Sequence, residues 1–430
     1  MPAKLAGNAG IYLGANILNA GIPFLLMPVL TRVLSPADYG TIAMFAIVLS
    51  VFGAFTGLSV HGAVSVRYFQ LDKRELAEYV GACVGILLAS TTIVFLAVFM
   101  VGDLLVDATG VPVDWLLVAV VLSGFQFLGN VRLALWQASG AALRYGRFQI
   151  GQSLVNAALS LVLILLVGMA WQGRLIGQGV AVTIFGLLAI YRLQRDELLK
   201  PPSNWKSRAS DALGFGLPLI PHVLGGLALA GSGQVVTNAF FGAAEAGYYA
   251  VAMQLGAVVG LLADAFVKVY GPWLYGELKK DDREGKSFIV GVTYIVFVFF
   301  ALASVSIAFG FVLIIPYFLG LQFSKTKDLV PIVVIGYGFT GMYYAIAGFF
   351  FFTSNTKFIS VVTVVSGGGM IVIMLLLAKY FGVFGVAVGF AAGQLAMLSL
   401  ALFVSNRIYP MPWFDLRLAY HSVANRLAHR

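Results

Sequence analysis

Charged side chains are scarce in this sequence. They make up 10% of the 430 residues, whereas hydrophobic residues make up 60%. The apolar residues also come in blocks of membrane-spanning length, separated by short polar breaks. This pattern excludes an ordinary water-soluble domain and leaves no stretch long enough for a separate one.

Cysteine and histidine are rarer still. The single cysteine, Cys83, excludes an internal disulfide and lies in an apolar block, where we expect it to pack as a small residue. The four histidines, at positions 61, 222, 421 and 429, lack the helical spacing of a metal pair. No phosphate-cradling P-loop is present either. The sequence therefore predicts no catalytic constellation, no metal site and no cofactor.

Twelve apolar blocks are present. A transmembrane helix needs about 20 mostly apolar residues, whereas barrel strands need only about 10. The blocks are therefore expected to be helices, and the predicted fold class is an all-α polytopic membrane protein. They cover residues 9–33, 39–61, 80–102, 115–137, 148–170, 174–193, 212–236, 245–268, 287–315, 329–352, 358–380 and 383–405.

Positive charge is unevenly distributed between the connections. If both termini are cytoplasmic, 20 of the 27 Lys and Arg residues lie on the cytoplasmic side and 5 on the other side, with 2 at helix ends. Cytoplasmic loops of membrane proteins carry such an excess. Membrane topology thus accounts for the net charge of +9, and we expect no nucleic-acid partner.

The longest polar stretch, residues 192–211, divides the chain into two sets of six blocks. We predict an N-terminal bundle at 1–193, a cytoplasmic linker at 194–211, a C-terminal bundle at 212–406 and a cytoplasmic amphipathic tail at 407–430. The segment SPADYGTIA at 35–43 also resembles GAAEAGYYA at 242–250, at an offset of 207. The halves are therefore expected to be pseudo-symmetric repeats in one orientation.

Amide and hydroxyl side chains form stripes along three apolar blocks. Their three- and four-residue spacing places them on one helical face, and amides facing lipid are costly. They either hydrogen-bond the helices together or line a wet cavity suited to sugar hydroxyls, which we favour. With His222 added, the cavity candidates are Tyr12, Asn16, Asn19, Gln126, Asn130, Gln152, Asn156 and His222.

The first loop carries a family resemblance. Residues 28–40 read PVLTRVLSPADYG, and 62–68 read GAVSVRY. These segments resemble bacterial oligosaccharide flippases of the multidrug/oligosaccharidyl-lipid/polysaccharide exporter superfamily. The resemblance implies a V-shaped pair of bundles that moves an undecaprenyl-pyrophosphate-linked oligosaccharide, such as an O-antigen unit, across the bacterial inner membrane by alternating access. It also implies membrane lipids, a polysaccharide polymerase and chain-length proteins as partners.

An anionic pyrophosphate calls for cationic receptors at the inner mouth. The candidates are His61, Arg67, Arg132 and Lys268. The alternative is that these residues obey the positive-inside rule and contact lipid phosphates. Asp264, the one acidic residue well inside a block, is a candidate for ion coupling or a partner of Lys268 four residues on.

Two other function classes are weighed. A cation-coupled drug antiporter of the same architecture would be expected to carry membrane-embedded carboxylates. A membrane-bound polymerase or glycosyltransferase would need acid and base residues on a sizeable external loop, and the loops here are too short. We therefore expect a transporter, not an enzyme.

The charge bias predicts that both termini and residues 192–211 are cytoplasmic. A cysteine introduced at Ser203 should resist a membrane-impermeant thiol reagent in intact cells and react after the inner membrane is opened. Labelling in intact cells with only the outer barrier permeabilised would contradict this topology.

Overall fold

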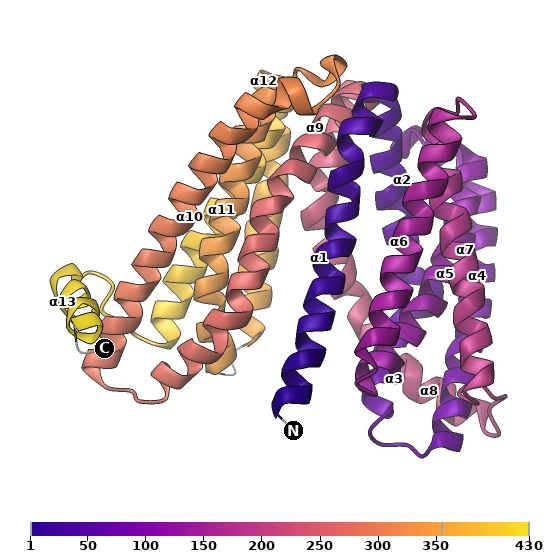
Figure 1. The fold of residues 1–430 in the computed structure, drawn as a ribbon, viewed down its shortest axis with the longest axis horizontal. Helices are drawn as coiled ribbons and strands as arrows, with labels where there is room; N and C mark the ends of the chain where they lie inside the picture. Colours follow the sequence, from indigo (N-terminus) through magenta and orange to yellow (C-terminus); the bar gives the residue numbers. More distant parts are fainter. Residues whose placement is uncertain (1, 354–355, 429–430) are drawn as a thin grey trace. The chain divides into compact units, whose positions relative to one another are not determined.

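The protein is helical throughout its described length. The computed structural model describes residues 2–353 and 356–428, and these ranges contain α-helices and short 3-10 turns but no β-strand (Figure 1). The chain forms two compact units, residues 1–247 and 248–430. The predicted boundaries at 193 and 212 stay a prediction.

The first unit contains α1 (Pro2–Val33), α2 (Pro36–Phe55), α3 (His61–Arg67), α4 (Lys73–Thr109), α5 (Val113–Ala138), α6 (Ala142–Leu165), α7 (Trp171–Arg195), α8 (Trp205–Gly216) and the first part of α9 (Ile220–Leu278). The second unit contains the rest of α9, α10 (Arg283–Phe318), α11 (Thr326–Phe352), α12 (Thr356–Ile408) and α13 (Leu416–Ala428). Short 3-10 turns lie at Thr56–Ser59, Leu217–Leu219 and Leu321–Phe323.

Two of the longest helices double back at a single glycine. In α9, Gly242 has a φ of 81°, and Gln234 Nε2 donates to the carbonyl of Ala246 at 3.0 Å across the bend. In α12, Gly382 has a φ of 61°, and a Cβ on Gly389 would lie 2.8 Å from Met374 Cα in the opposite arm. Only glycine adopts such a φ without strain.

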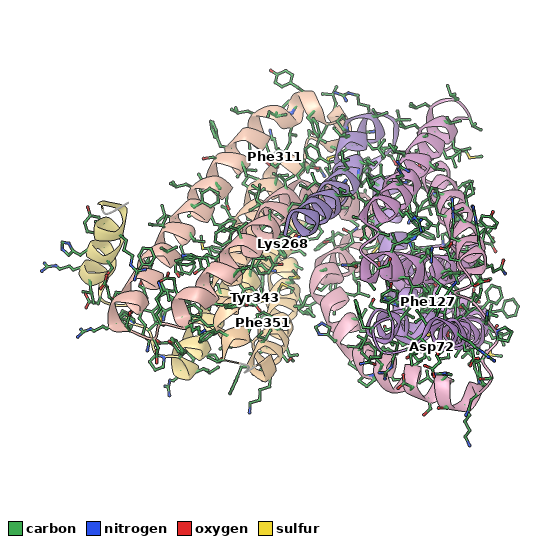
Figure 2. All side chains as sticks on the ribbon, turned by 60° about the horizontal axis from the view of Figure 1, so that its bottom comes forward. Asp72, Phe127, Lys268, Phe311, Tyr343 and Phe351 are labelled. Atoms are coloured by element: carbon green, nitrogen blue, oxygen red, sulfur yellow. The ribbon has the colours of Figure 1, made fainter. Side chains whose placement is uncertain are left out.

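These hairpins account for the number of spans. In the described residues, nine helices are long and apolar enough to cross a membrane, and Ile17–Val33 forms a shorter apolar helix. Because α9 and α12 each supply two crossings, the total matches the twelve predicted blocks. The predicted all-α membrane fold is confirmed, and the side chains that cover it are largely apolar (Figure 2).

The first-loop motif is a helix start. Ser35 caps α2, because its hydroxyl accepts from the amide of Asp38 at 3.1 Å. The Asp38 carboxylate accepts in return from the Ser35 amide at 2.9 Å. Pro36 occupies the first turn, where its missing N–H costs nothing. This reciprocal capping box satisfies donors that would otherwise be unpaired at the helix end.

The same turn packs against the repeat-related segment. A Cβ on Gly40 would lie 1.9 Å from the carbonyl oxygen of Ala243, and a Cβ on Gly247 would lie 1.9 Å from that of Pro36. These pairs exchange under the offset of 207, since Pro36 corresponds to Ala243 and Gly40 to Gly247. The repeat offset therefore converts each of these two contacts into the other, as expected for pseudo-symmetric repeats.

The second predicted span, residues 39–61, is not one continuous helix. α2 ends at Phe55, and Gly57 and Leu58 adopt left-handed φ values of 74° and 48°. Ser90 satisfies the freed amide of Gly57 at 2.8 Å, and a Cβ on Gly57 would lie 2.3 Å from the ring of Phe127. Such a break is tolerated at membrane depth only where the protein re-satisfies the backbone.

The predicted linker is shorter than expected, because α8 begins inside it at Trp205. Asn204 caps this helix by accepting from the Ser207 amide at 3.1 Å. The linker is also docked on α4, since the Lys200 amide donates to the carbonyl of Ala77 at 3.1 Å. The last part of the predicted linker is therefore helical, because Asn204 caps a new helix after the two prolines.

The packing of Cys83 is confirmed, and part of the predicted tail is helical. Cys83 is fully buried in an apolar core that includes Tyr79 and Phe127, so it packs as predicted. The tail forms the helix α13, and Arg426 holds it by donating to Glu277 at 2.9 Å and by stacking 4.3 Å over the ring of Phe288.

Replacing Gly40 with alanine should destabilise the protein, because the new methyl group meets backbone rather than a movable side chain. Overpacking of this kind costs about 1–3 kcal/mol, which thermal unfolding of the detergent-solubilised protein would measure. Gly53→Ala in the same helix is the matched control, since nothing lies within 4 Å of its Cβ position. Equal melting of both variants would show that the contact at Gly40 is dispensable.

Candidate functional site

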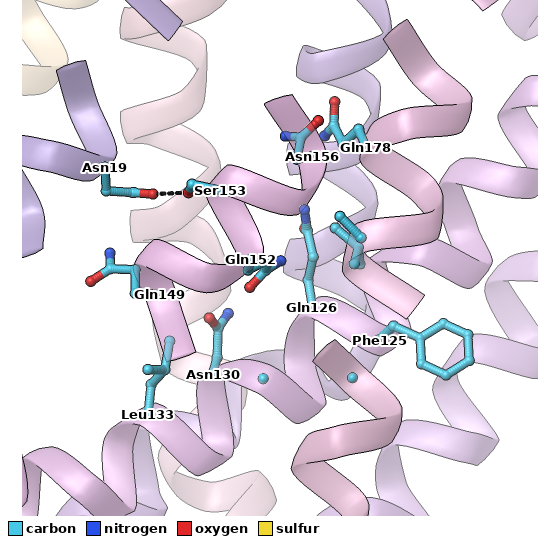
Figure 3. Close-up of a pocket in the computed structure, with 14 residues that line it drawn as sticks. Asn19, Phe125, Gln126, Asn130, Leu133, Gln149, Gln152, Ser153, Asn156 and Gln178 are labelled. Carbon is cyan, nitrogen blue, oxygen red and sulfur yellow. Dashed lines mark hydrogen bonds between the residues drawn. The ribbon is translucent and has the colours of Figure 1, made fainter. Parts of the chain in front are cut away.

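A polar cavity lies inside the first unit, enclosed by α1, α5, α6 and α7 (Figure 3). Its volume is about 390 Å³. Amide and hydroxyl groups dominate its lining: Asn19, Gln126, Asn130, Gln149, Gln152, Ser153, Asn156 and Gln178. Phe125, Leu133, Ala181 and Val182 supply the apolar part of the wall.

The helical repeat brings these groups together. Residues 149, 152, 153 and 156 of α6 lie at steps of three and four, so they share one face. Residues 126 and 130 of α5 do the same, and Ser153 donates from α6 to the Asn19 amide oxygen of α1. Gly186 of α7 allows the close approach of α5, because a Cβ there would lie 2.8 Å from Phe125 Cβ.

A guanidinium group lies beside the amides. Arg174 donates from Nη1 to the amide oxygen of Asn156 and, at 2.9 Å, to the hydroxyl of Ser160. Both partners are neutral, and in the described part of the chain no carboxylate forms an ion pair with Arg174. Arg174 thus holds the lining residue Asn156 from outside the cavity, whose own polar lining is neutral.

This lining can bind hydroxyls but is poorly suited to other chemistry. Each amide offers both a donor and an acceptor, which is what a sugar hydroxyl needs. Among the lining side chains that the structure describes there is no carboxylate or histidine. The cavity consequently lacks the acid and base pair of a glycosidase and the carboxylate that would favour a bound cation.

Five of the eight predicted cavity residues line this space: Asn19, Gln126, Asn130, Gln152 and Asn156. The side chains of Tyr12 and Asn16 lie outside the described residues. His222 is exposed on α9 and is not among the lining residues. Contact with sugar stays a prediction for all eight.

Sequence reasoning missed Arg174 and Gln178. The sixth predicted block begins at Arg174 itself, and its charge is counted only toward membrane topology, whereas α7 already begins at Trp171. The signal that could have found them is their spacing of four, which places both on the face of α7 that meets the α6 stripe.

The predicted phosphate receptors already have partners inside the protein. Arg67 forms a two-pronged ion pair with Asp211, at 2.6 and 2.9 Å, and Lys268 donates to Asp264 at 2.6 Å within α9. The predicted pairing of Asp264 with Lys268 is thus confirmed, whereas a coupling role for Asp264 stays a prediction.

The other two candidates lie deeper. Arg132 is 2% exposed and pairs with Asp196. The imidazole of His61 packs edge-on against Phe127, with ring centroids 5.5 Å apart, and its Nδ1 is buried without a hydrogen-bond partner in the described residues. A role for these four side chains in pyrophosphate binding stays a prediction.

Comparison with known proteins identifies the family of the chain. The family described as "Polysaccharide biosynthesis protein" matches residues 5–275. Lsg locus protein 1 of Haemophilus influenzae is 26% identical over 284 residues, which cover 64% of this chain and 67% of that protein.

Solved structures share the fold at low identity. The lipid II flippase MurJ, in an inward closed conformation, matches with a TM-score of 0.68 and 15% identity over 98% of this chain and 90% of its own. A multidrug resistance MATE family transporter of the MOP superfamily, in an inward-facing conformation, matches with a TM-score of 0.63 and 16% identity over 92% of this chain and 94% of its own.

Gln152→Leu should impair the predicted sugar transport without unfolding the protein. No hydrogen bond ties the Gln152 side chain to another described residue, so its amide is available to a ligand. Lost hydrogen bonds of about 0.5–1.5 kcal/mol each predict a roughly three- to tenfold loss. Transport would be read as polysaccharide output, and stability as the thermal midpoint.

Two controls sharpen this test. Asn156→Leu should lower both readouts, because Arg174 would lose a buried acceptor at a cost of about 1–3 kcal/mol. Leu154→Ala, on the exposed face of α6, should lower neither. If Gln152→Leu transports normally, the amides form hydrogen bonds between helices and do not bind a ligand.

Proposed function

Because the chain belongs to the polysaccharide biosynthesis protein family, we propose that it is a flippase for a lipid-linked oligosaccharide. Its substrate is a polyprenyl-pyrophosphate-linked repeat unit, of O-antigen or another polysaccharide, carried across the bacterial inner membrane by alternating access. The protein itself performs no catalytic turnover. Both termini face the cytoplasm, where the positive charge is concentrated in this topology.

The amide-lined cavity is the observation that carries this proposal. A glycan that enters a membrane loses hydrogen bonds to water, and each unpaired polar group in an apolar medium is costly. Eight amide or hydroxyl side chains gather in one space of an otherwise apolar bundle. They supply replacement hydrogen bonds without the strong, specific charge pairing that would hold a substrate too tightly for release.

A cation-coupled antiporter of small molecules is the second candidate. The likeness to a MATE family transporter favours it at the level of fold. Two observations weigh against it: the described cavity lining contains no carboxylate, and Asp264 is neutralised by Lys268. Lipid II, named for the MurJ structure, supports a lipid-linked substrate class for this fold.

A strain lacking this protein should lose its surface polysaccharide and accumulate lipid-linked units on the cytoplasmic leaflet. Thin-layer chromatography of extracted lipids, with enzymatic access to the sugar from either side, would measure this accumulation. Complementation by Leu154→Ala but not by Gln152→Leu would connect the phenotype with the cavity. Normal polysaccharide together with altered drug tolerance would instead favour the antiporter. A further expectation, that a polymerase and chain-length proteins act beside it, follows from the same assignment.

A further inference from the structure

Five arginines gather around one cavity at the linker end of the first unit. The cavity has a volume of about 400 Å³. Arg132 comes from α5, Arg144 and Arg147 from the start of α6, and Arg192 and Arg195 from the end of α7. We call this set the arginine pocket. In the proposed topology it faces the cytoplasm.

Acidic groups do not balance this charge. Asp196 is the only acidic residue in the described lining, and it pairs with Arg132. In the part of the chain that the structure describes, no ion pair is formed by Arg144, Arg147, Arg192 or Arg195. Arg192, which is half-buried, and Arg144, Arg147 and Arg195, which are exposed, therefore line one pocket without a carboxylate partner among the described residues, and like charges repel each other.

Arg132 is the one deeply buried arginine in the described lining of the pocket. It is 2% exposed, its guanidinium lies 4.4 Å from the ring centre of Trp136, and its Nε is buried without a hydrogen-bond partner in the described residues. A charge buried this deeply is costly unless it is fully paired. The positive-inside rule explains arginines near a helix end, but it does not explain why one arginine of the pocket is buried.

The pocket also has an apolar wall. Trp136, Phe148, Phe185 and Leu188 line it beside the arginines. Guanidinium groups bind phosphate through two parallel hydrogen bonds, and basic pockets between transmembrane helices on the cytoplasmic side bind polyanionic lipid headgroups. Cations and an apolar surface together fit a ligand that is a phosphate at one end and hydrocarbon at the other.

We propose that the arginine pocket binds a lipid headgroup that carries two phosphates. The uncompensated arginines bind the phosphate oxygens, and the apolar wall contacts the first part of the lipid chain. Arg67 and Lys268 are not among the residues that line this pocket. If the lipid is the polyprenyl diphosphate carrier, the pocket is an entry site that rests on the proposed function. If it is a two-phosphate bilayer lipid, the pocket is a structural lipid site.

The test measures lipid binding to the purified full chain by native mass spectrometry. Three probes are used: polyprenyl diphosphate, cardiolipin and phosphatidylglycerol, which carries a single phosphate. The pocket variant replaces Arg144, Arg147 and Arg192 with glutamine and leaves the buried Arg132–Asp196 pair intact. The matched control replaces Lys206, Lys279 and Arg283, which are exposed and lie outside the pocket, so it loses the same charge.

We expect the pocket variant to bind the two-phosphate lipids at least about tenfold more weakly, and the control to bind them as the wild type does. Equal weakening in both variants, or no weakening in either, would overturn the proposal. Replacing the same three arginines with lysine keeps the charge but removes the two-pronged geometry, so an intermediate loss is expected. This variant also checks that weaker binding does not result from unfolding.

Comparison of the probes distinguishes the two sources. Loss of polyprenyl diphosphate binding that exceeds the loss of cardiolipin binding assigns the pocket to the carrier, and the reverse assigns it to the bilayer lipid. Because binding is measured without transport, a failure of the flippase proposal in cells would leave this result unchanged.

Discussion

The structure depends on one constraint: within hydrocarbon, every hydrogen-bonding group needs a partner inside the protein. Long helices satisfy the backbone. Where the chain leaves the helix at Thr56–Ser59, Ser90 accepts the amide of Gly57, and Thr56 donates to Ser123 at 2.8 Å. One exception lies in the amide-lined cavity, where the Gln149 side-chain oxygen is buried without a partner in the described residues. A buried polar atom without a protein partner indicates a place where water or a ligand supplies the missing hydrogen bond.

The first-loop motif has a structural explanation. Ser35 and Asp38 form the capping box that starts α2, and Gly40 allows the backbone of Ala243 to approach. None of these three residues lines the amide cavity or the arginine pocket. The motif that carries the family resemblance therefore reports how the chain folds, and substrate choice must depend on other positions.

Local patterns predicted the spans and the α6 stripe because both arise from the periodicity of a single helix. The amides at 149, 152, 153 and 156 lie on one face whatever surrounds them. The same reasoning could not find the partner of Arg67, since Asp211 lies 144 residues away. It also assigned the first part of α8 to the linker, although Asn204 caps that helix through a local contact with the Ser207 amide. Arg67 and Arg132 looked like separate phosphate receptors in the sequence, but in the folded protein each forms an ion pair with an aspartate from a distant segment.

The glycine hairpins have a consequence for biogenesis. At Gly382 the two arms of α12 are joined without an extended loop, so Lys379, exposed three residues before the glycine, is the charged side chain that has to be translocated at the turn. Both arms can enter the bilayer from the same side as a single helical hairpin, with their backbone groups already bonded within each arm. Lys357 near the start of α12 and Arg407 near its end remain on the side of entry. One glycine thus allows two spans to be inserted in a single step, with their orientation set by the charges at the open end.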